Sequence, residues 1–239
     1  MKKTEAVSAR MRAKTVVAVL CGLAMMAASA MPASAASDKD KIAGRLNDAA
    51  AVIRQIMATP DKAIPTSILS GASCVVVVPS YKKAAFVVGG QYGQGVATCR
   101  TARGWSAPVC VQMAGGSFGF QIGGQATDLV MVAMNDQGLQ DMLKNKFKLG
   151  ADAAASAGPV GRNAAAGTDW KLNAEFLTYS RSKGLFAGIN LDGTVVSQNQ
   201  DDTRALYGSD VPFETILKGN QPTPAEARAF VDTVARYFV

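Results

Sequence analysis

A glycine-rich stretch between Ala114 and Asp128 is the first part of the sequence whose composition suggests chemistry. It reads AGGSFGFQIGGQATD and holds five glycines in fifteen residues, with Gly115, Gly119 and Gly123 at every fourth position. A glycine-rich loop can bind phosphate through its main-chain N–H groups. A GxxxG series can pack membrane helices, and glycines on one face of a strand leave that face bare. The surrounding pattern has to decide among these three.

A strand explains the stretch best. A nucleotide loop needs G-x-G-x-x-G or G-x-x-x-x-G-K-[ST] between a strand and a helix, and neither this stretch nor the related GGQYGQG fits. Polar residues interrupt a segment that is far too short to span a membrane. In a strand, Phe118, Phe120 and Ile122 face the core, while the bare face at Gly119 and Gly123 lets another backbone, a helix or a ligand approach.

The sequence contains no histidine, which excludes His-based catalytic triads and histidine metal sites. Cys74, Cys99 and Cys110 form no C-x-x-C pair, so we expect no metal, and no motif indicates a cofactor. In an oxidising compartment, Cys99 and Cys110 could form a disulfide across a hairpin that turns at Arg103-Gly104. The alternative is that the cysteines are small, buried hydrophobic side chains.

The N-terminal segment, residues 1–35, has the three parts of a secretory signal peptide. Five basic residues precede an apolar run from Val16 to Ala28, and Ala33-Ser34-Ala35 supplies an A-x-A cleavage site. We therefore expect export to the periplasm or the medium. The alternative is a lipoprotein anchored at Cys21, although bulky Leu20 stands where a small residue is expected.

Removal of this leader changes the charge of the chain. The leader carries five basic residues and one acid, so 20 Lys and Arg remain against 17 Asp and Glu, and the net charge falls from +7 to +3. The basic isoelectric point therefore belongs largely to the leader, and we expect no nucleic-acid partner. About 200 residues remain, which suits one domain.

Helical periodicity predicts two long helices at the ends of the mature chain. The first runs from Ser37 to Met57, within a segment of helix and linker that covers residues 36–63. Its apolar stripe suits packing on a sheet, which we favour over membrane contact of its basic flanks. Near the C-terminus, Thr223 and Glu226 predict a capping box, with Pro224 at the first helical position.

Residues 64–239 form the main domain, which includes the C-terminal helix, and strand patterns dominate it up to that helix. CVVVVP reads as a strand buried on both faces, and short apolar runs separated by Gly, Lys or Ser follow it closely. Asn135 begins a short helix, and Asp192-Gly193 predicts a hairpin turn. The sequence thus predicts a single α+β domain with an antiparallel β-meander or barrel-like sheet, packed with the N-terminal and C-terminal helices.

Five blocks of the chain, in order, resemble the SYLF domain, also called the actin-binding yeast-protein-like domain. They are VVVVPSYKKAAFVVGGQYGQGV, RGWSAP, GGSFGFQIGGQATDLVMVAMN, KFKLGADAAASAGPVGR and AEFLTYSRSKGLFAGINLDGTVV. The resemblance covers roughly Ile64 to Tyr207. It implies a membrane-lipid-binding module, including phosphatidylinositol binding in eukaryotic relatives, and actin binding in some fungal ones. Because an exported protein does not meet actin, we expect anionic membrane lipids as the partner and actin binding to be unlikely.

The headgroup contact implied by the resemblance falls on basic residues of the matching blocks. Lys82 and Lys83 lie in SYKKAAF, and Arg181 and Lys183 lie in YSRSKGLF, each predicted as a turn between apolar strands. Cations near a membrane surface attract anionic lipids by about 1 kcal/mol each. Convergence of the two turns at one end of the sheet would form a basic rim.

Three further residues complete the predicted lipid site. Leu185 and Phe186 would be apolar anchors, and Arg162, in a Gly/Pro loop, would be an additional cation. The competing interpretation is that all these charges are ordinary solvated residues.

Two other function classes remain as alternatives. An enzyme could use Asp201-Asp202, or Ser180 beside Lys183, but no motif requires such a site, and we expect no catalytic residues. A structural or protein-interaction role in the cell envelope would use the glycine-lined face of the sheet to receive a partner.

Overall fold

The computed structural model describes residues 37–59, 64–161, 174–182 and 185–239, without the side chains of residues 84–88 and 117–125. Ser37–Val239 forms one α+β unit, which confirms the predicted fold class. The helix that we assigned to a separate N-terminal segment belongs to this unit. Residues 1–35 lie outside the described part of the chain.

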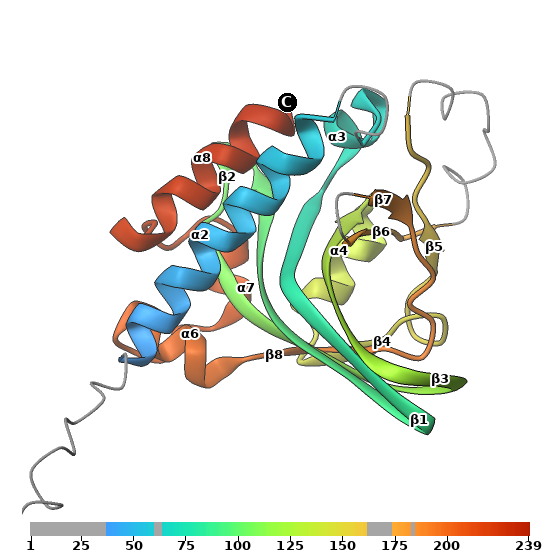
Figure 1. Ribbon diagram of the computed structural model, residues 1–239. Helices are drawn as coiled ribbons and strands as arrows, with labels where there is room; N and C mark the ends of the chain where they lie inside the picture. The colour runs from blue at the N-terminus through green and yellow to red at the C-terminus, as the bar shows by residue number, and fades with distance from the viewer. Residues whose placement is uncertain (1–36, 60–63, 162–173, 183–184) are drawn as a thin grey trace, which may run out of the picture. The chain divides into compact units, whose positions relative to one another are not determined.

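The N-terminal helix α2 (Asp38–Met57) begins where the sequence predicts. The Ser37 hydroxyl accepts from the Asp40 N–H, and the Asp40 carboxylate accepts from the Ser37 N–H, which completes a capping box. Its apolar stripe, including Ile42, Leu46 and Ile53, is buried against β1 and the C-terminal helix α8 (Arg228–Tyr237). Figure 1 shows α2 and α8 side by side on one face of the sheet. The preference for packing over membrane contact is therefore confirmed for this stripe.

Two unusually long strands form the centre of the sheet. β1 (Cys74–Thr101) pairs antiparallel with β3 (Val109–Ala133), and the short β2 (Gly104–Trp105) lies in the connection between them. The register runs from Cys74↔Ala133 to Ala97↔Val109. Several predicted short strands are thus parts of one continuous two-stranded ribbon.

β1 turns back on itself, so that its two ends meet. The Arg100 N–H donates to the Ser73 carbonyl at 2.7 Å. A Cβ added to Gly95 would lie 2.3 Å from the Val77 carbonyl oxygen, because the two halves of the strand are in contact there. A close backbone approach to a glycine therefore occurs at Gly95, which lies outside the Ala114–Asp128 stretch for which the sequence predicts it. The side chains predicted for the Gly119 and Gly123 face lie outside the described set.

Six further strands, counted with β2, widen this ribbon into a curled sheet. They are β2, β4 (Lys146–Lys148), β5 (Ala155–Ala157), β6 (Phe176–Ser182), β7 (Leu185–Gly188) and β8 (Val195–Gln198). One half of β3 pairs with β6, and the other half pairs with β8, which also pairs with β4. β7 is antiparallel to β6, whereas β5 is parallel to it. The sheet is therefore mixed, because the β5–β6 pair is parallel, while the other pairs of these strands are antiparallel, as predicted.

The core covers both faces of this sheet. In the first residues of β1, Val75 and Val77 pack with the α2 and α8 side, while Val76 and Val78 pack on the opposite side. This confirms that CVVVV is buried on both faces. The remaining helices are α3 (Thr66–Gly71), α4 (Asp136–Leu143), α6 (Gln200–Tyr207), α7 (Phe213–Leu217) and the 3-10 turn η2 (Ala225–Ala227). Within the described residues, none of the helices has both the length and the apolar composition to cross a bilayer.

Two predicted local motifs form differently. Gly193 adopts φ +83° in a turn, but β7 and β8 on either side of it pair with other strands and form no hairpin. The C-terminal helix has no side-chain cap, because Glu226 pairs with Lys39 at 2.9 Å and the chain first forms η2.

The predicted disulfide between Cys99 and Cys110 is wrong. Cys99 is bonded to Cys74, since the reversal of β1 brings the two ends of this strand together. Cys110 lies opposite Val96 in the ribbon and is a buried free thiol. The alternative interpretation, a small buried side chain, holds for Cys110 alone.

Candidate anionic-ligand groove

A carboxylate joins three strands at the point where β1 leaves its regular register. The pairing of β1 with β3 shifts between Val78 and Tyr81, and Ser80 adopts φ +53°, which is uncommon for a residue other than glycine. The Ser80 N–H donates to Asp128 Oδ1 at 3.0 Å, and the Arg181 guanidinium donates to Asp128 Oδ2 at 2.6 Å. Asp128 therefore holds the β1 bulge against β6.

The bulge places two lysines on the strand that follows it. Lys82 is exposed, while Lys83 is half-buried, because successive side chains of a strand point to opposite faces. Burial lowers the pKa of the Lys83 ammonium below its ordinary value. Both residues lie within β1 and not in a turn, so the predicted turn at SYKKAAF is corrected.

Lys82 lines a groove between α2 and β1, which we call the α2–β1 groove. Its volume is about 420 Å³. The residues that line it are Lys41, Gly44, Arg45 and Asp48 from α2, and Pro79, Ser80, Lys82, Tyr92, Gly93 and Gln94 from β1. Lys82 makes no hydrogen bond or ion pair with any residue that the structure describes.

The other cations of the α2–β1 groove are already engaged. Arg45 donates to Asp202 at 2.6 Å and to Gln94 at 2.9 Å, which ties α2 to α6 and β1. Lys41 forms an exposed ion pair with Asp38 on its own helix, and such pairs contribute little and open readily. An incoming anion would therefore find Lys82 available first and Lys41 second.

An aromatic residue completes the α2–β1 groove. Tyr92 lies on the second half of β1 and is 47% exposed, so its ring meets solvent beside Lys82. A ring with a polar hydroxyl suits the boundary between an aqueous headgroup and an apolar phase. Sequence reasoning missed both Tyr92 and Lys41, because only the reversal of β1 and the packing of α2 bring them to Lys82.

Of the other three predicted headgroup-binding cations, the structure describes only Arg181. Arg181 lies near Lys82, because β1 and β6 flank β3 at Ala126 and Asp128, but its charge is paired with Asp128. Lys183 and Arg162 lie outside the described residues. The register therefore places Lys82 and Arg181 in the same region of the sheet, with only Lys82 unpaired.

The two predicted apolar anchors differ sharply from each other. Leu185 is 66% exposed, as an anchor requires, at the start of β7 opposite Ser182. Phe186 is only 6% exposed, and its ring stacks on Tyr179 at 5.3 Å. Phe186 is thus a core residue and not an anchor, because alternate side chains of β7 enter the core.

The described residues define the class of this protein as a single α+β domain on a curled sheet, with a partly basic groove beside the sheet's central bulge. Within them, no three His, Cys, Asp or Glu side chains are placed to hold a metal ion. Residues 114–237 match the family model described as "Ysc84: Las17-binding protein actin regulator".

Individual relatives show the same relationship. The chain is 34% identical over 201 residues to the SH3 domain-containing protein PJ696.02 of Schizosaccharomyces pombe, covering 82% of this chain and 46% of that protein. It is 34% identical over 170 residues to human SH3 domain-containing YSC84-like protein 1, covering 70% and 49%. It is 33% identical over 183 residues to LAS seventeen-binding protein 3 of Saccharomyces cerevisiae, covering 71% and 40%.

The chain therefore belongs to the Ysc84, or SYLF, family, which confirms the resemblance seen in its five sequence blocks. It spans about half the length of the curated relatives that it matches. The family is described by binding and regulation and not by catalysis.

Proposed function

We propose that this protein is an exported, non-enzymatic module that binds anionic phospholipid headgroups in the α2–β1 groove. The observation that carries the proposal is Lys82, an exposed cation without a partner among the described residues, at the edge of a 420 Å³ groove. A headgroup phosphate would gain a charge-assisted contact there without breaking an existing ion pair. Phosphatidylinositol lipids and bacterial phosphatidylglycerol or cardiolipin share this phosphate chemistry.

Tyr92 and Leu185 support peripheral contact with a membrane. They are the exposed large hydrophobic residues of the described part, apart from the C-terminal Val239. Tyr92 lies opposite Ala114 of β3, and Leu185 lies opposite Ser182 of β6, so the two side chains would contact the membrane from different parts of the sheet. Lipid acyl chains would meet these side chains while the phosphate occupies the α2–β1 groove.

Sedimentation with vesicles tests this function. Vesicles that contain phosphatidylglycerol or cardiolipin should pellet the protein, and salt should weaken the binding because exposed charges are screened. Lys82→Ala should lower the affinity by about fivefold, which corresponds to about 1 kcal/mol. Lys146→Ala removes another exposed lysine, from β4 and outside the α2–β1 groove, and should leave the affinity nearly unchanged. Equal losses in both variants, or no sedimentation at low salt, would refute the proposal.

Export is tested by the mass of the protein recovered from a bacterial host. Cleavage after Ala35 gives a chain that begins at Ala36, and a lipid on Cys21 gives a larger, detergent-dependent species. Export also agrees with a disulfide between Cys74 and Cys99, since disulfides persist in oxidising compartments. Recovery of all 239 residues from the cytoplasm would contradict this part of the proposal.

A protein partner is the second candidate function, because the family is described as a Las17-binding actin regulator. Its tests are pelleting with filamentous actin and capture by Las17. The envelope interaction role would use the glycine-lined face at Gly119 and Gly123, which lies in the part of β3 whose side chains the structure does not describe.

A further inference from the structure

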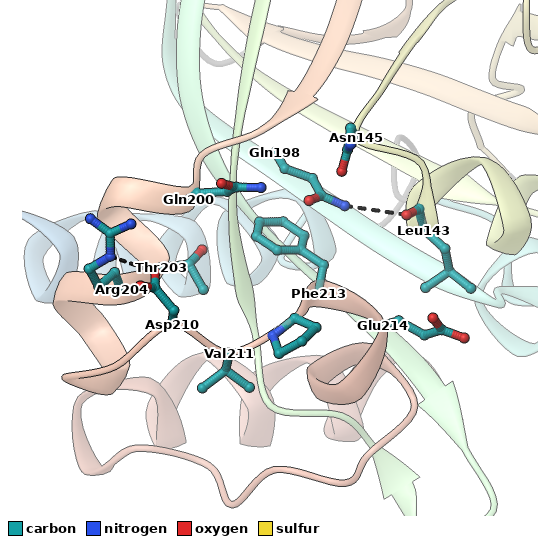
Figure 2. Close-up of a pocket in the computed structure, with 11 residues that line it drawn as sticks. Leu143, Asn145, Gln198, Gln200, Thr203, Arg204, Asp210, Val211, Phe213 and Glu214 are labelled. Carbon is teal, nitrogen blue, oxygen red and sulfur yellow. Dashed lines mark hydrogen bonds and ion pairs between the residues drawn. The ribbon is translucent and has the colours of Figure 1, made fainter.

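A second, larger recess shares no lining residue with the α2–β1 groove, and we call it the α6–α7 cleft. Its volume is about 590 Å³, within the range of ordinary ligand sites. Figure 2 shows its walls, formed by the end of α4, the end of β8, α6 and the segment that leads into α7. None of the basic residues discussed above lines it.

The charged groups of the α6–α7 cleft are already paired within the protein. Arg204 donates to Asp210 at 2.5 Å, and the carboxylate of Glu214 accepts from Lys218 at 2.5 Å. The α6–α7 cleft therefore presents no unpaired charge among its described lining residues. A strongly charged ligand would compete with one of these pairs, whereas an uncharged ligand leaves all of them in place, so we take the ligand to be uncharged.

The polar wall of the α6–α7 cleft is built from carboxamides. The side chain of Gln198 donates to the Leu143 and Lys144 carbonyls, which fixes its position. The side chains of Asn145 and Gln200 make no hydrogen bond with any described residue. A carboxamide donates and accepts at the same time, so two free ones match a ligand in which N–H and C=O groups alternate.

The apolar floor of the α6–α7 cleft distinguishes between two uncharged ligands. It consists of Val211, Pro212 and Phe213, and Figure 2 shows the Phe213 ring between the carboxamides and the α7 segment. Phe213 is only 5% exposed, so its face is not free to stack on a sugar ring. Small aliphatic side chains of a peptide, in contrast, need only an apolar surface.

We propose that the α6–α7 cleft binds a short, extended, uncharged peptide segment through its main chain. Asn145 and Gln200 would each take one N–H and one C=O of the peptide, while Val211 and Pro212 would contact its side chains. The inference is independent of lipid binding, because the α6–α7 cleft and the α2–β1 groove share no lining residue.

Nuclear magnetic resonance of the ¹⁵N-labelled protein tests this proposal. The probe is a pool of hexapeptides of Ala, Val, Ser, Thr and Pro, acetylated and amidated at their ends to remove charge. The side-chain NH₂ signals of Asn145 and Gln200 should shift on titration. The double variant Asn145→Ala/Gln200→Ala should bind at least tenfold more weakly, as expected for two lost hydrogen bonds. Gln55→Ala removes an exposed carboxamide on α2 and should bind as the parent does.

Three outcomes would overturn the proposal. The first is the absence of any shift with the peptide pool, and the second is equal binding by the double variant. The third is a response of the same signals to cellohexaose in place of the peptides, which would assign the α6–α7 cleft to a glycan.

Discussion

Arg181 on β6 donates to Asp128 on β3 at 2.6 Å, so a cation predicted to meet lipid is neutralised by an acid of the neighbouring strand. Both side chains are mostly buried, at 25% and 17% exposure. The same carboxylate also holds the N–H of Ser80. Asp128 therefore links the shape of the β1 bulge to the charge available in this central region of the sheet.

Asp128→Asn should lower stability and strengthen lipid binding. The amide keeps an acceptor for Ser80 but loses the charge-assisted bond to Arg181, which we expect to lower the free energy of unfolding by about 1–2 kcal/mol. The released guanidinium should raise affinity for anionic vesicles. Urea denaturation and sedimentation measure the two effects. Asp201→Asn, at an exposed acid 3.7 Å from Arg204, is the control and should change neither quantity appreciably. Weaker lipid binding by Asp128→Asn would contradict this account of Arg181.

Reduction of the disulfide should destabilise the fold. Cys74 and Cys99 are 25 residues apart, and closing a loop of that length stabilises a protein by about 3 kcal/mol in the chain-entropy model. Urea denaturation of the Cys74→Ser/Cys99→Ser variant should show a free energy of unfolding that is lower by this amount. Addition of a reductant should not lower it further. Cys110→Ala is the matched control and should remain sensitive to the reductant. Thiol titration of the denatured chain from residue 36 onward should find one free thiol, and three would exclude the bond.

Gly95→Ala should be among the most damaging small substitutions in the protein. The added methyl group would lie 2.3 Å from the Val77 carbonyl oxygen, and backbone cannot move as a side chain can. We expect a loss of about 3 kcal/mol or more in the free energy of unfolding. Gly90→Ala, where an added Cβ meets nothing within 4 Å, should change it by less than about 0.5 kcal/mol. Similar values for the two variants would show that the halves of β1 are not in contact.

Alkaline pH should destabilise the protein through Cys110. Burial raises the pKa of its thiol from 9.0 to about 12, so the unfolded chain loses this proton at a lower pH than the folded chain does. The contribution of this thiol to the free energy of unfolding is fully present below pH 9 and decreases as the pH rises towards 12. The expected decrease between pH 8 and pH 10 is about 1 kcal/mol. Denaturation curves of the parent and of Cys110→Ala should diverge by this amount. Tyr179, whose pKa burial also raises, contributes equally to both proteins.

Local patterns predicted the elements whose stabilising contacts are close in sequence. The helix predicted from Ser37 to Met57 forms as α2, and the helix after Asn135 begins as expected, with the Asn135 side chain accepting from the Gly138 N–H. The strand beginning at Cys74 was predicted as buried on both faces, because a run of valines has no polar face. Each of these depends on spacing over a few residues.

Long-range contacts account for the features that the sequence did not predict. The disulfide between Cys99 and Cys74 depends on the reversal of β1, and no local sequence motif predicts that reversal. Glu226 forms an ion pair with Lys39, which lies far away in the chain, in place of the expected capping box. At the candidate site, Lys82 was identified from its sequence block, but Tyr92 and the α2 side of the α2–β1 groove depend on packing.

The bond between Cys74 and Cys99 also determines how the protein would respond to a protease. A single cut at any peptide between these residues would add one water to the mass and release no fragment, since both pieces stay covalently joined. Electrophoresis without reductant would show an apparently intact chain, and only a thiol reagent would separate the two products. A cut in the part of β1 between these residues would therefore escape detection by non-reducing electrophoresis, because the two pieces of the chain stay linked.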